Sequence, residues 1–248
     1  MTSTNIDYFD YDFESFALQF LHDYDNKIVQ PTVNPHLHET LNQNFSLDEI
    51  LNAIEYLKNG KCPGTDGFPA EFVKAGTYEL APLLQMLFNY FIERREFPKG
   101  WCEGLSIALF KAGDRLDPAC YRRLKILSVF EKIFEIAFNN RFDFLNEAYN
   151  KIDMHNNGFL KGARTSDNIF IFQSLVSRQL NLNKPLYVCF VDFSKAFDLV
   201  NRNLLFFKLI QAGWSGRIID TMRSLYRQTS FKLRHKGKLS ESILEERS

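Results

Sequence analysis

The amino-acid sequence predicts an α+β fold, and three observations support that class. Apolar residues recur at helical spacing in several long segments, and short apolar or alternating runs that are typical of strands lie between them. The order of these elements lacks the regular alternation of strand and helix that builds a doubly wound parallel sheet. We therefore expect helices packed around a small mixed or antiparallel sheet.

The composition is that of a globular protein, with 45% hydrophobic and 24% charged residues in 248. The longest apolar run, 186–191, is much shorter than the roughly 20 residues of a membrane-spanning helix, so we expect no membrane partner. The first ten residues carry acids and no basic cluster, so we do not expect a secretory signal. The cysteines are far apart without a CxxC pair, which indicates reduced thiols in an intracellular protein.

The net charge of zero conceals an asymmetry along the chain. Residues 1–44 hold seven acidic side chains against Lys27 alone, which gives 1 − 7 = −6 and leaves +6 for the remainder. We expect residues 1–44 to form an acidic lead-in or linker, partly disordered, with one short helix carrying Phe13, Phe16 and Phe20. The moderately basic remainder permits a polyanionic partner.

The ordered body is expected to begin at Phe45. Ser46 and Glu49 form an S-x-x-E capping box, which predicts a helix that Gly60 ends. The following CPGTDGFP (62–69) contains two Pro and two Gly and predicts a rigid turn. A helix over 77–96 is predicted next.

The remaining elements follow from the same patterns. Strands are predicted at 105–110 and 121–127, then helices over 128–148 and 166–180, and then a clear apolar strand at 186–192. Helices are predicted over 203–212 and 214–227, with Asn201 and Arg202 expected to cap or steady the first. A final hairpin is predicted at 231–234 and 239–244.

Asp192 is the most informative single residue, because it ends the apolar strand. A carboxylate at that place reaches the edge of a sheet, where a hydrated Mg²⁺ can bind it. The alternative is that Asp192 only caps the next turn. The chain contains no GxxxxGK[ST], GxGxxG, HExxH or GxSxG motif, which argues against the enzyme classes that use them.

Five phrases together resemble a known family. They are KNGKCPGTDGFPAEFVK (58–74), IALFK (107–111), YRRLKILSVFEKIFE (121–135), NNGFLKGARTSDNIF (156–170) and FVDFSKAFDLVN (190–201). In this order and spacing they are similar to consecutive motifs of a non-LTR retrotransposon (LINE-type) reverse transcriptase, over roughly residues 45–245.

The resemblance implies a right-hand polymerase fold with fingers at 45–185 and a partial palm at 186–248. In such an enzyme two Mg²⁺ ions align the primer hydroxyl and the incoming triphosphate. The implied partners are an RNA template, a DNA primer and a dNTP. The implied location is intracellular, with nuclear action following from the usual life cycle of such elements.

The resemblance also assigns roles to individual residues. Asp192 matches the first metal-binding catalytic aspartate, and Phe197 matches the bulky residue under the incoming sugar. Lys111 and Arg122 match finger residues that hold the triphosphate, for which a point charge and a guanidinium fork are suited. Arg164 and Ser166 match a template-contacting element. The plain alternatives are a core aromatic at Phe197 and solvated surface charges elsewhere.

The chain departs from the family pattern at several places. Arg123 and Lys125 replace a Pro and a small polar residue, which adds charge to a finger strand, and Leu160 replaces an Arg. The chain stops before the motif that carries the second metal carboxylates and before the thumb, and it has no Asp-Asp dipeptide. We expect that it does not polymerise DNA alone, exposes an apolar sheet edge and depends on a further chain to complete the palm.

Two other hypotheses remain open from the sequence. The first is a non-catalytic nucleic-acid-binding or scaffold remnant, which would contact phosphates through a set of basic residues: Lys58, Lys61, Lys74, Lys111, Arg122, Arg123, Lys161 and Arg164. The second is an unrelated α+β domain, in which Lys111, Arg122 and Asp192 would not face one cleft.

Overall fold

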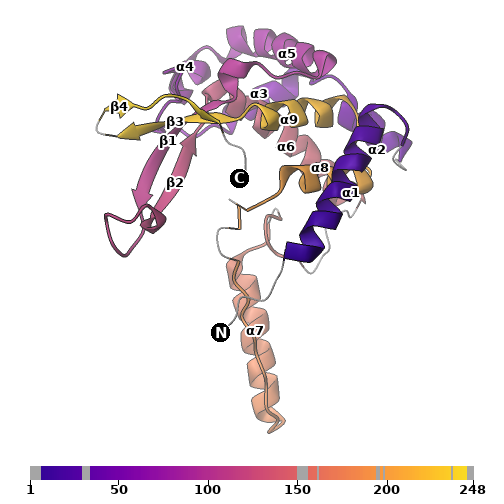
Figure 1. Ribbon diagram of the computed structural model, residues 1–248, viewed down its shortest axis with the longest axis vertical. Helices are drawn as coiled ribbons and strands as arrows, with labels where there is room; N and C mark the ends of the chain where they lie inside the picture. The colour runs from indigo at the N-terminus through magenta and orange to yellow at the C-terminus, as the bar shows by residue number, and fades with distance from the viewer. Residues whose placement is uncertain are drawn as a thin grey trace. The chain divides into compact units, whose positions relative to one another are not determined.

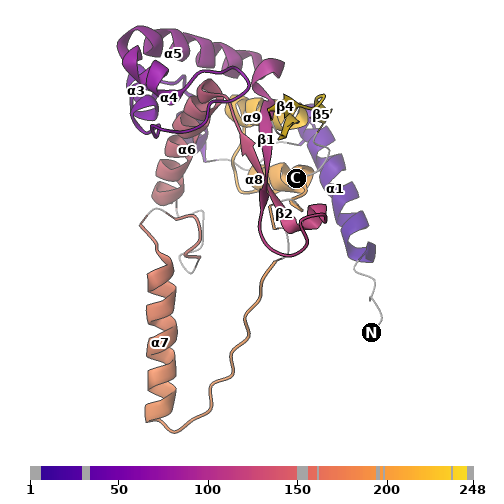
Figure 2. The same cartoon turned by 90° about the vertical axis from the view of Figure 1, so that its left-hand side faces the viewer.

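A computed structural model describes residues 7–29, 34–149, 156–160, 162–193, 196–197, 199–235 and 237–244 (Figures 1 and 2). It divides into two compact units. Unit 1 comprises residues 1–141 and 197–248, and unit 2 comprises residues 142–196. The expected division into 1–44, fingers at 45–185 and partial palm at 186–248 stays a prediction.

The α+β class is confirmed by the elements. The α-helices are α1 (Asp7–Asp25), α2 (Pro35–Asn42), α3 (Leu47–Glu55), α4 (Ala70–Ala75), α5 (Thr77–Arg94), α6 (Val129–Tyr149), α7 (Thr165–Asn181), α8 (Arg202–Gln211) and α9 (Arg217–Arg227). The strands are β1 (Glu103–Phe110), β2 (Tyr121–Ile126), β3 (Ser230–His235), β4 (Lys238–Leu239) and β5 (Ile243–Leu244). No helix in the described ranges is both long and apolar enough to cross a membrane.

The local start signal acts as predicted, whereas the predicted stop is wrong: α3 ends at Glu55, before Gly60. The Ser46 side chain accepts from the Glu49 N–H at 3.2 Å, and the Glu49 carboxylate accepts from the Ser46 N–H at 2.8 Å, which completes the capping box of α3. The Ser128 hydroxyl donates to Asp66 at 2.5 Å and so docks the 62–69 turn on the β2–α6 junction. A Cβ on Gly64 would lie 2.8 Å from the Leu127 carbonyl oxygen, so this docking requires glycine.

The sheet lies in unit 1 and joins distant parts of the chain. Its order is β2-β1-β3-β4, with β5 also paired to β3. β1 runs antiparallel to β2 and parallel to β3, so the final hairpin extends the sheet that the first two strands begin. The predicted hairpin is confirmed, with one difference. The pairing of β3 shifts by one residue between β4 and β5, which is the signature of a β-bulge.

Aromatic rings form a cluster in unit 1, although its buried residues are mainly aliphatic. Trp101 stacks on Phe130 with 5.7 Å between ring centroids, and Phe97 meets Phe134 at 4.9 Å. Phe88 contacts both Trp101 and Phe134 edge-on. Because such contacts join α5, α6 and the segment before β1, they hold the base of the sheet against the helices.

The N-terminal segment is more ordered than the sequence analysis expected. The helix around Phe13, Phe16 and Phe20 is confirmed as α1, and these three rings pack edge-on around Phe207 of α8. Residues 35–42, expected to be linker, instead form α2 with Leu37 and Leu41 fully buried. The Asn34 side chain caps α2 and Pro35 opens it, which are local signals for a helix start.

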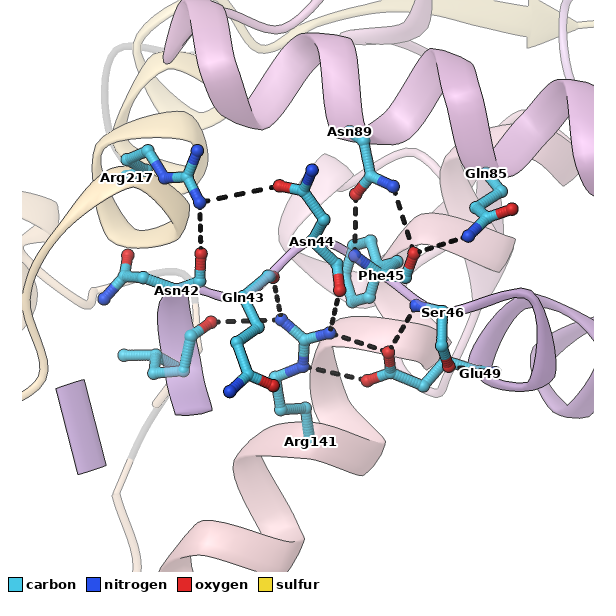
Figure 3. A network of polar contacts seen from close by, with 11 residues as sticks. Asn42, Gln43, Asn44, Phe45, Ser46, Glu49, Gln85, Asn89, Arg141 and Arg217 are labelled. Carbon is cyan, nitrogen blue, oxygen red and sulfur yellow. Dashed lines mark hydrogen bonds and ion pairs between the residues drawn. The ribbon is translucent and has the colours of Figure 1, made fainter. Parts of the chain in front are cut away.

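A buried arginine ties the connection between α2 and α3 to α6 (Figure 3). The Arg141 guanidinium donates two bonds to the Glu49 carboxylate, at 2.8 and 2.7 Å, and further bonds to three backbone carbonyls, those of Leu41, Gln43 and Asn44. It also lies 4.4 Å from the centroid of the Phe45 ring. The Arg141 network therefore satisfies the buried Leu41 carbonyl and holds the two part-buried bonds to Gln43 and Asn44.

The prediction of an apolar strand at 186–192 is wrong. These residues belong to unit 2, pair with no strand in the described part of the chain, and are exposed; Tyr187 is 90% accessible. A strand is stable only when a neighbour pairs its N–H and C=O groups, and apolar composition alone does not supply one. The expected exposed sheet edge beside Asp192 is therefore wrong as well, because no sheet forms there, although the apolar run itself is exposed.

Candidate functional site

The β1–β2 hairpin brings Lys111 and Arg122 together. The Lys111 N–H donates to the Cys120 carbonyl at 2.8 Å, so the antiparallel pairing continues one residue beyond β1. Arg122 pairs with Leu109, and alternation along the strands places Lys111 and Arg122 on the same face as diagonal neighbours. Both side chains are exposed. The hairpin therefore presents an ammonium and a guanidinium on one face at its loop end.

Arg123 and Lys125 lie on the opposite face of the same strand. The Arg123 guanidinium lies 4.6 Å from the centroid of the Phe231 ring on β3. The Lys125 stem crosses Gly104, where an added Cβ would lie 2.5 Å from the Lys125 Cε, so a larger residue there would displace the lysine stem. The two residues that depart from the family pattern therefore form a separate basic pair on this face.

A cavity of about 470 Å³ adjoins that second face. Its lining includes Arg123, Lys125, Glu131, Glu135, Arg202 and Tyr226. Phe197 also lines it and is 73% exposed, which places its ring at the mouth and not in a core. Phe197 thus lines the same cavity as Arg123 and Lys125, whereas Lys111 and Arg122 lie on the other face of the hairpin.

The residues behind this cavity are held by hydrogen bonds and aromatic contacts. The Asn201 side chain accepts from the N–H groups of Asn203 and Leu204 and caps α8, as predicted. The Arg202 guanidinium donates to the Tyr226 carbonyl at 2.6 Å and to the Thr229 hydroxyl at 2.7 Å. These bonds join the start of α8 to the end of α9 and steady one wall of the cavity.

Two carboxyl groups one helical turn apart on α6 face the cavity. Burial raises the pKa of Glu131 to about 8, with the charge of Glu135 as a further cause. Burial also raises the pKa of Glu135 to about 7, against the opposing effect of Lys125 and Lys132. Glu131 is only 2% exposed, and its Oε2 has no hydrogen-bond partner among the described residues. At neutral pH Glu131 is therefore mainly protonated. The cavity wall is then more positive than it would be if Glu131 carried its usual negative charge.

Lysines surround a second cavity in unit 1, of about 310 Å³. Lys58 and Lys61 reach it from the segment after α3, and Lys132 reaches it from α6. Its floor is apolar and includes Pro63, Phe68, Leu127 and Ile136. The Glu135 carboxyl group, whose pKa burial raises to about 7, also lines this cavity. Three lysines against one carboxyl group leave a positive balance that suits an anionic ligand with an apolar face.

The other predicted site residues belong to unit 2. Asp192 is exposed but does not lie at the edge of a sheet, because no strand forms at 186–192, and its role as a metal ligand stays a prediction. Arg164 precedes α7, where its N–H donates to Asp167 at 2.8 Å, and Ser166 is exposed in the first turn. That Asp192, Lys111 and Arg122 face one cleft stays a prediction, and Lys161 lies outside the described residues.

The carboxylates of the described residues do not form a complete site for Mg²⁺. A site for two ions requires several carboxylates, because the ions repel each other at about 4 Å. The described residues contain no group of three His, Cys, Asp or Glu side chains placed to hold a metal ion. Asp192 alone is a suitable oxygen donor but does not complete such a site.

Glu131 and Glu135 were not identified from the sequence as part of this site. Their helical spacing within VFEKIFE could have indicated that they face the interior. Glu131 lies about one turn before Glu135 and before Phe134, which is fully buried. A carboxyl group on the apolar face of a helix is a candidate for a raised pKa.

The chain is similar to several known proteins. No family model matches. Over 62% of its length, the chain is 25% identical to the probable RNA-directed DNA polymerase from transposon BS of Drosophila melanogaster. The matched part is 17% of that protein. Over 62% of its length, it is 24% identical to the RNA-directed DNA polymerase from mobile element jockey of the same species. The matched part is 17% of that protein.

A third similar protein extends the match. The chain is 24% identical over 82% of its length to 22% of the Pol polyprotein from type-1 retrotransposable element R2 of Bradysia coprophila. The chain thus spans about one fifth or less of the length of these relatives. The resemblance found in the five sequence phrases is confirmed: the chain is related to part of the RNA-directed DNA polymerases of non-LTR retrotransposons.

Proposed function

We propose that this chain is the nucleotide- and template-contacting part of a mobile-element reverse transcriptase, with a right-hand polymerase fold comprising the fingers and the beginning of the palm. The observation that carries the proposal is the β1–β2 hairpin, which holds Lys111 and Arg122 on one face at the positions that match triphosphate-binding residues of the family. Guanidinium and ammonium groups on one face suit the oxygens of a triphosphate.

In this proposal the remaining residues have distinct roles. Phe197 lies under the sugar of the incoming dNTP, and Arg164 and Ser166 contact the RNA template. Asp192 supplies one oxygen ligand for Mg²⁺, which in the complete enzyme neutralises the developing phosphate charge. Further carboxylates must complete that metal site, and a further chain segment would cover the apolar surface of unit 2. Nuclear action is part of the same proposal.

The two faces of β2 carry different basic pairs, for which we propose different binding roles. Lys111 and Arg122 would bind the triphosphate, whereas Arg123 and Lys125 border the cavity that Phe197 shares. Because Glu131 is mainly protonated at neutral pH, it does not cancel the Lys125 charge. In this proposal Arg123 and Lys125 add positive charge to the cavity that Phe197 also lines.

The experiment is a binding measurement with a fluorescent RNA template–DNA primer hybrid. We expect the template-matched dNTP with Mg²⁺ to tighten binding severalfold, and a mismatched dNTP to have no effect. Replacing both Lys111 and Arg122 by Ala should remove the effect of the matched dNTP. Primer extension should not exceed that of Asp192→Ala. Equal binding of the hybrid with matched and mismatched dNTP would contradict the polymerase role.

A second candidate function is non-catalytic binding of nucleic acid. The cavity bordered by Lys58, Lys61 and Lys132 favours it, because these lysines need no metal or nucleotide to attract a phosphate backbone. In that case hybrid binding would weaken steeply with salt and depend on these lysines, with no response to dNTP. Loss of binding in Lys58→Ala with Lys61→Ala, but not in the Lys111 and Arg122 variants, would favour this candidate.

A further inference from the structure

Helix α5 has apolar side chains on two sides. One side enters the core of unit 1 through Leu84, Phe88 and Ile92. On the other side lie Leu83, Met86, Leu87 and Tyr90, at the i, i+3, i+4 and i+7 positions of one helix face. We call these four residues the outer stripe. They are between 36% and 67% exposed, so unit 1 does not cover them.

The position of the outer stripe makes it accessible to a partner. In both views α5 runs along the edge of unit 1 (Figures 1 and 2). A contiguous exposed row of large apolar side chains is uncommon on a surface that meets only water. The outer stripe therefore needs an explanation beyond the packing of unit 1.

The charges at the two ends of the outer stripe indicate which partner fits. Glu79 lies one turn before Leu83, and Arg94 lies one turn after Tyr90. Both are exposed and on the same face as the stripe. The point between Met86 and Leu87 is equally far from Glu79 and Arg94, and also from Leu83 and Tyr90. The stripe is thus self-complementary under a two-fold rotation about that point.

We infer that the outer stripe of α5 is a self-association surface on which a second copy of this chain docks antiparallel. The dyad then pairs Glu79 with Arg94 of the partner at each end, and Leu83 with the partner's Tyr90. A parallel pair would instead place like charges together at both ends. Helices crossing at about +20° bring such a row of side chains into contact.

The first test is sedimentation of the full chain over a range of concentrations. The wild type should form a reversible dimer, and Leu83→Glu with Met86→Glu should raise its dissociation constant at least about tenfold. Tyr78→Glu is the matched control, because Tyr78 is exposed on the same helix but outside the outer stripe. A monomeric wild type, or a dimer that survives the two glutamates, would overturn the inference.

The second test reverses the charges. Glu79→Arg and Arg94→Glu should each weaken the dimer by about tenfold, since each makes two like-charge contacts. The double variant should restore it, and the two single variants should pair with each other when mixed. Fluorescence of the buried Trp214 verifies folding. If the double variant stays weak, or if only Phe190→Ser in unit 2 abolishes association, the dimer does not form through α5.

Discussion

The two units of this chain handle apolar residues in opposite ways. In unit 1, rings from α5, α6 and the segment before β1 pack edge to face, and Phe88 and Phe134 are fully buried. In unit 2, α7 has no buried residue, although Ile169, Phe170 and Phe172 follow one another closely in its sequence. One ring contact, between Phe172 and Phe190 at 5.9 Å, joins α7 to the apolar run that follows it.

The difference shows that apolar content does not by itself determine burial. A helix or strand buries its apolar face only against a second layer, and unit 1 supplies that layer with its own sheet and helices. Polar groups reinforce this difference. In unit 1 the Arg141 network joins α2, α3 and α6, whereas the exposed apolar segments of unit 2 contain few charges. Variants that act on one unit and not the other can test the comparison.

The largest effect is expected from Arg141→Met. This change leaves three carbonyls and Glu49 without their shared donor, so we predict a loss of about 4 kcal/mol in the free energy of unfolding of unit 1. Arg141→Lys should lose less, because it keeps the charge but not the guanidinium fork. Trp101 and Trp214, the two tryptophans of the chain, both lie in unit 1 and report its unfolding in urea.

Arg178→Met on α7 is the matched control for this variant. Arg178 is exposed and belongs to unit 2, so the tryptophan signal should change little. If Arg178→Met destabilised unit 1 as much as Arg141→Met did, the two units would not be separate in stability.

A smaller effect is expected from pH. The folded chain holds the Glu131 proton up to a pKa of about 8, whereas an unfolded chain releases it near 4.5. The stability that Glu131 contributes is therefore complete below pH 4.5 and is lost as pH rises through 8, on the order of 3 kcal/mol between pH 5 and 7.5. Glu131→Gln should remove most of this loss in urea unfolding.

The exposed Glu55→Gln is the control for the pH measurement. It should leave the pH dependence of unfolding unchanged. Stability of the wild type that rises between pH 5 and 7.5 would show that Glu131 is ionised in the folded state.

Local signals explain which parts of the fold could be predicted. The capping box at Ser46 and Glu49 acts within four residues, and its helix was predicted correctly. The strand at 186–192 depends on a neighbour elsewhere in the chain, and its prediction was wrong because the described residues offer none. The role of Arg141 arises from contacts with α2 and α3, far away in the sequence, so no local pattern could reveal it.

The candidate site shows the same limit. Alternation along 121–126 already separates Arg122 from Arg123, so two basic faces follow from the sequence once a strand is accepted. That Phe197 lines the same cavity as Arg123 and Lys125 depends on how distant segments pack, and only the structure reveals it.

The smallest effect on stability is expected in unit 2. Phe190→Ser with Phe193→Ser should change the unfolding of unit 1 by less than about 0.5 kcal/mol, because both rings are exposed in the other unit. The same change should lower the binding of a hydrophobic dye. A marked loss of tryptophan-detected stability would mean that unit 1 uses these rings as part of its core.

The most direct test of the central claim compares the two basic faces of the β1–β2 hairpin in binding an RNA–DNA hybrid with matched dNTP and Mg²⁺. Lys111→Ala with Arg122→Ala should abolish the response to the matched dNTP and reduce the salt dependence by about two phosphate contacts. Arg123→Ala with Lys125→Ala should weaken binding but keep the dNTP response. If the dNTP response instead survives the first pair of changes and disappears with the second, Lys111 and Arg122 do not hold the triphosphate.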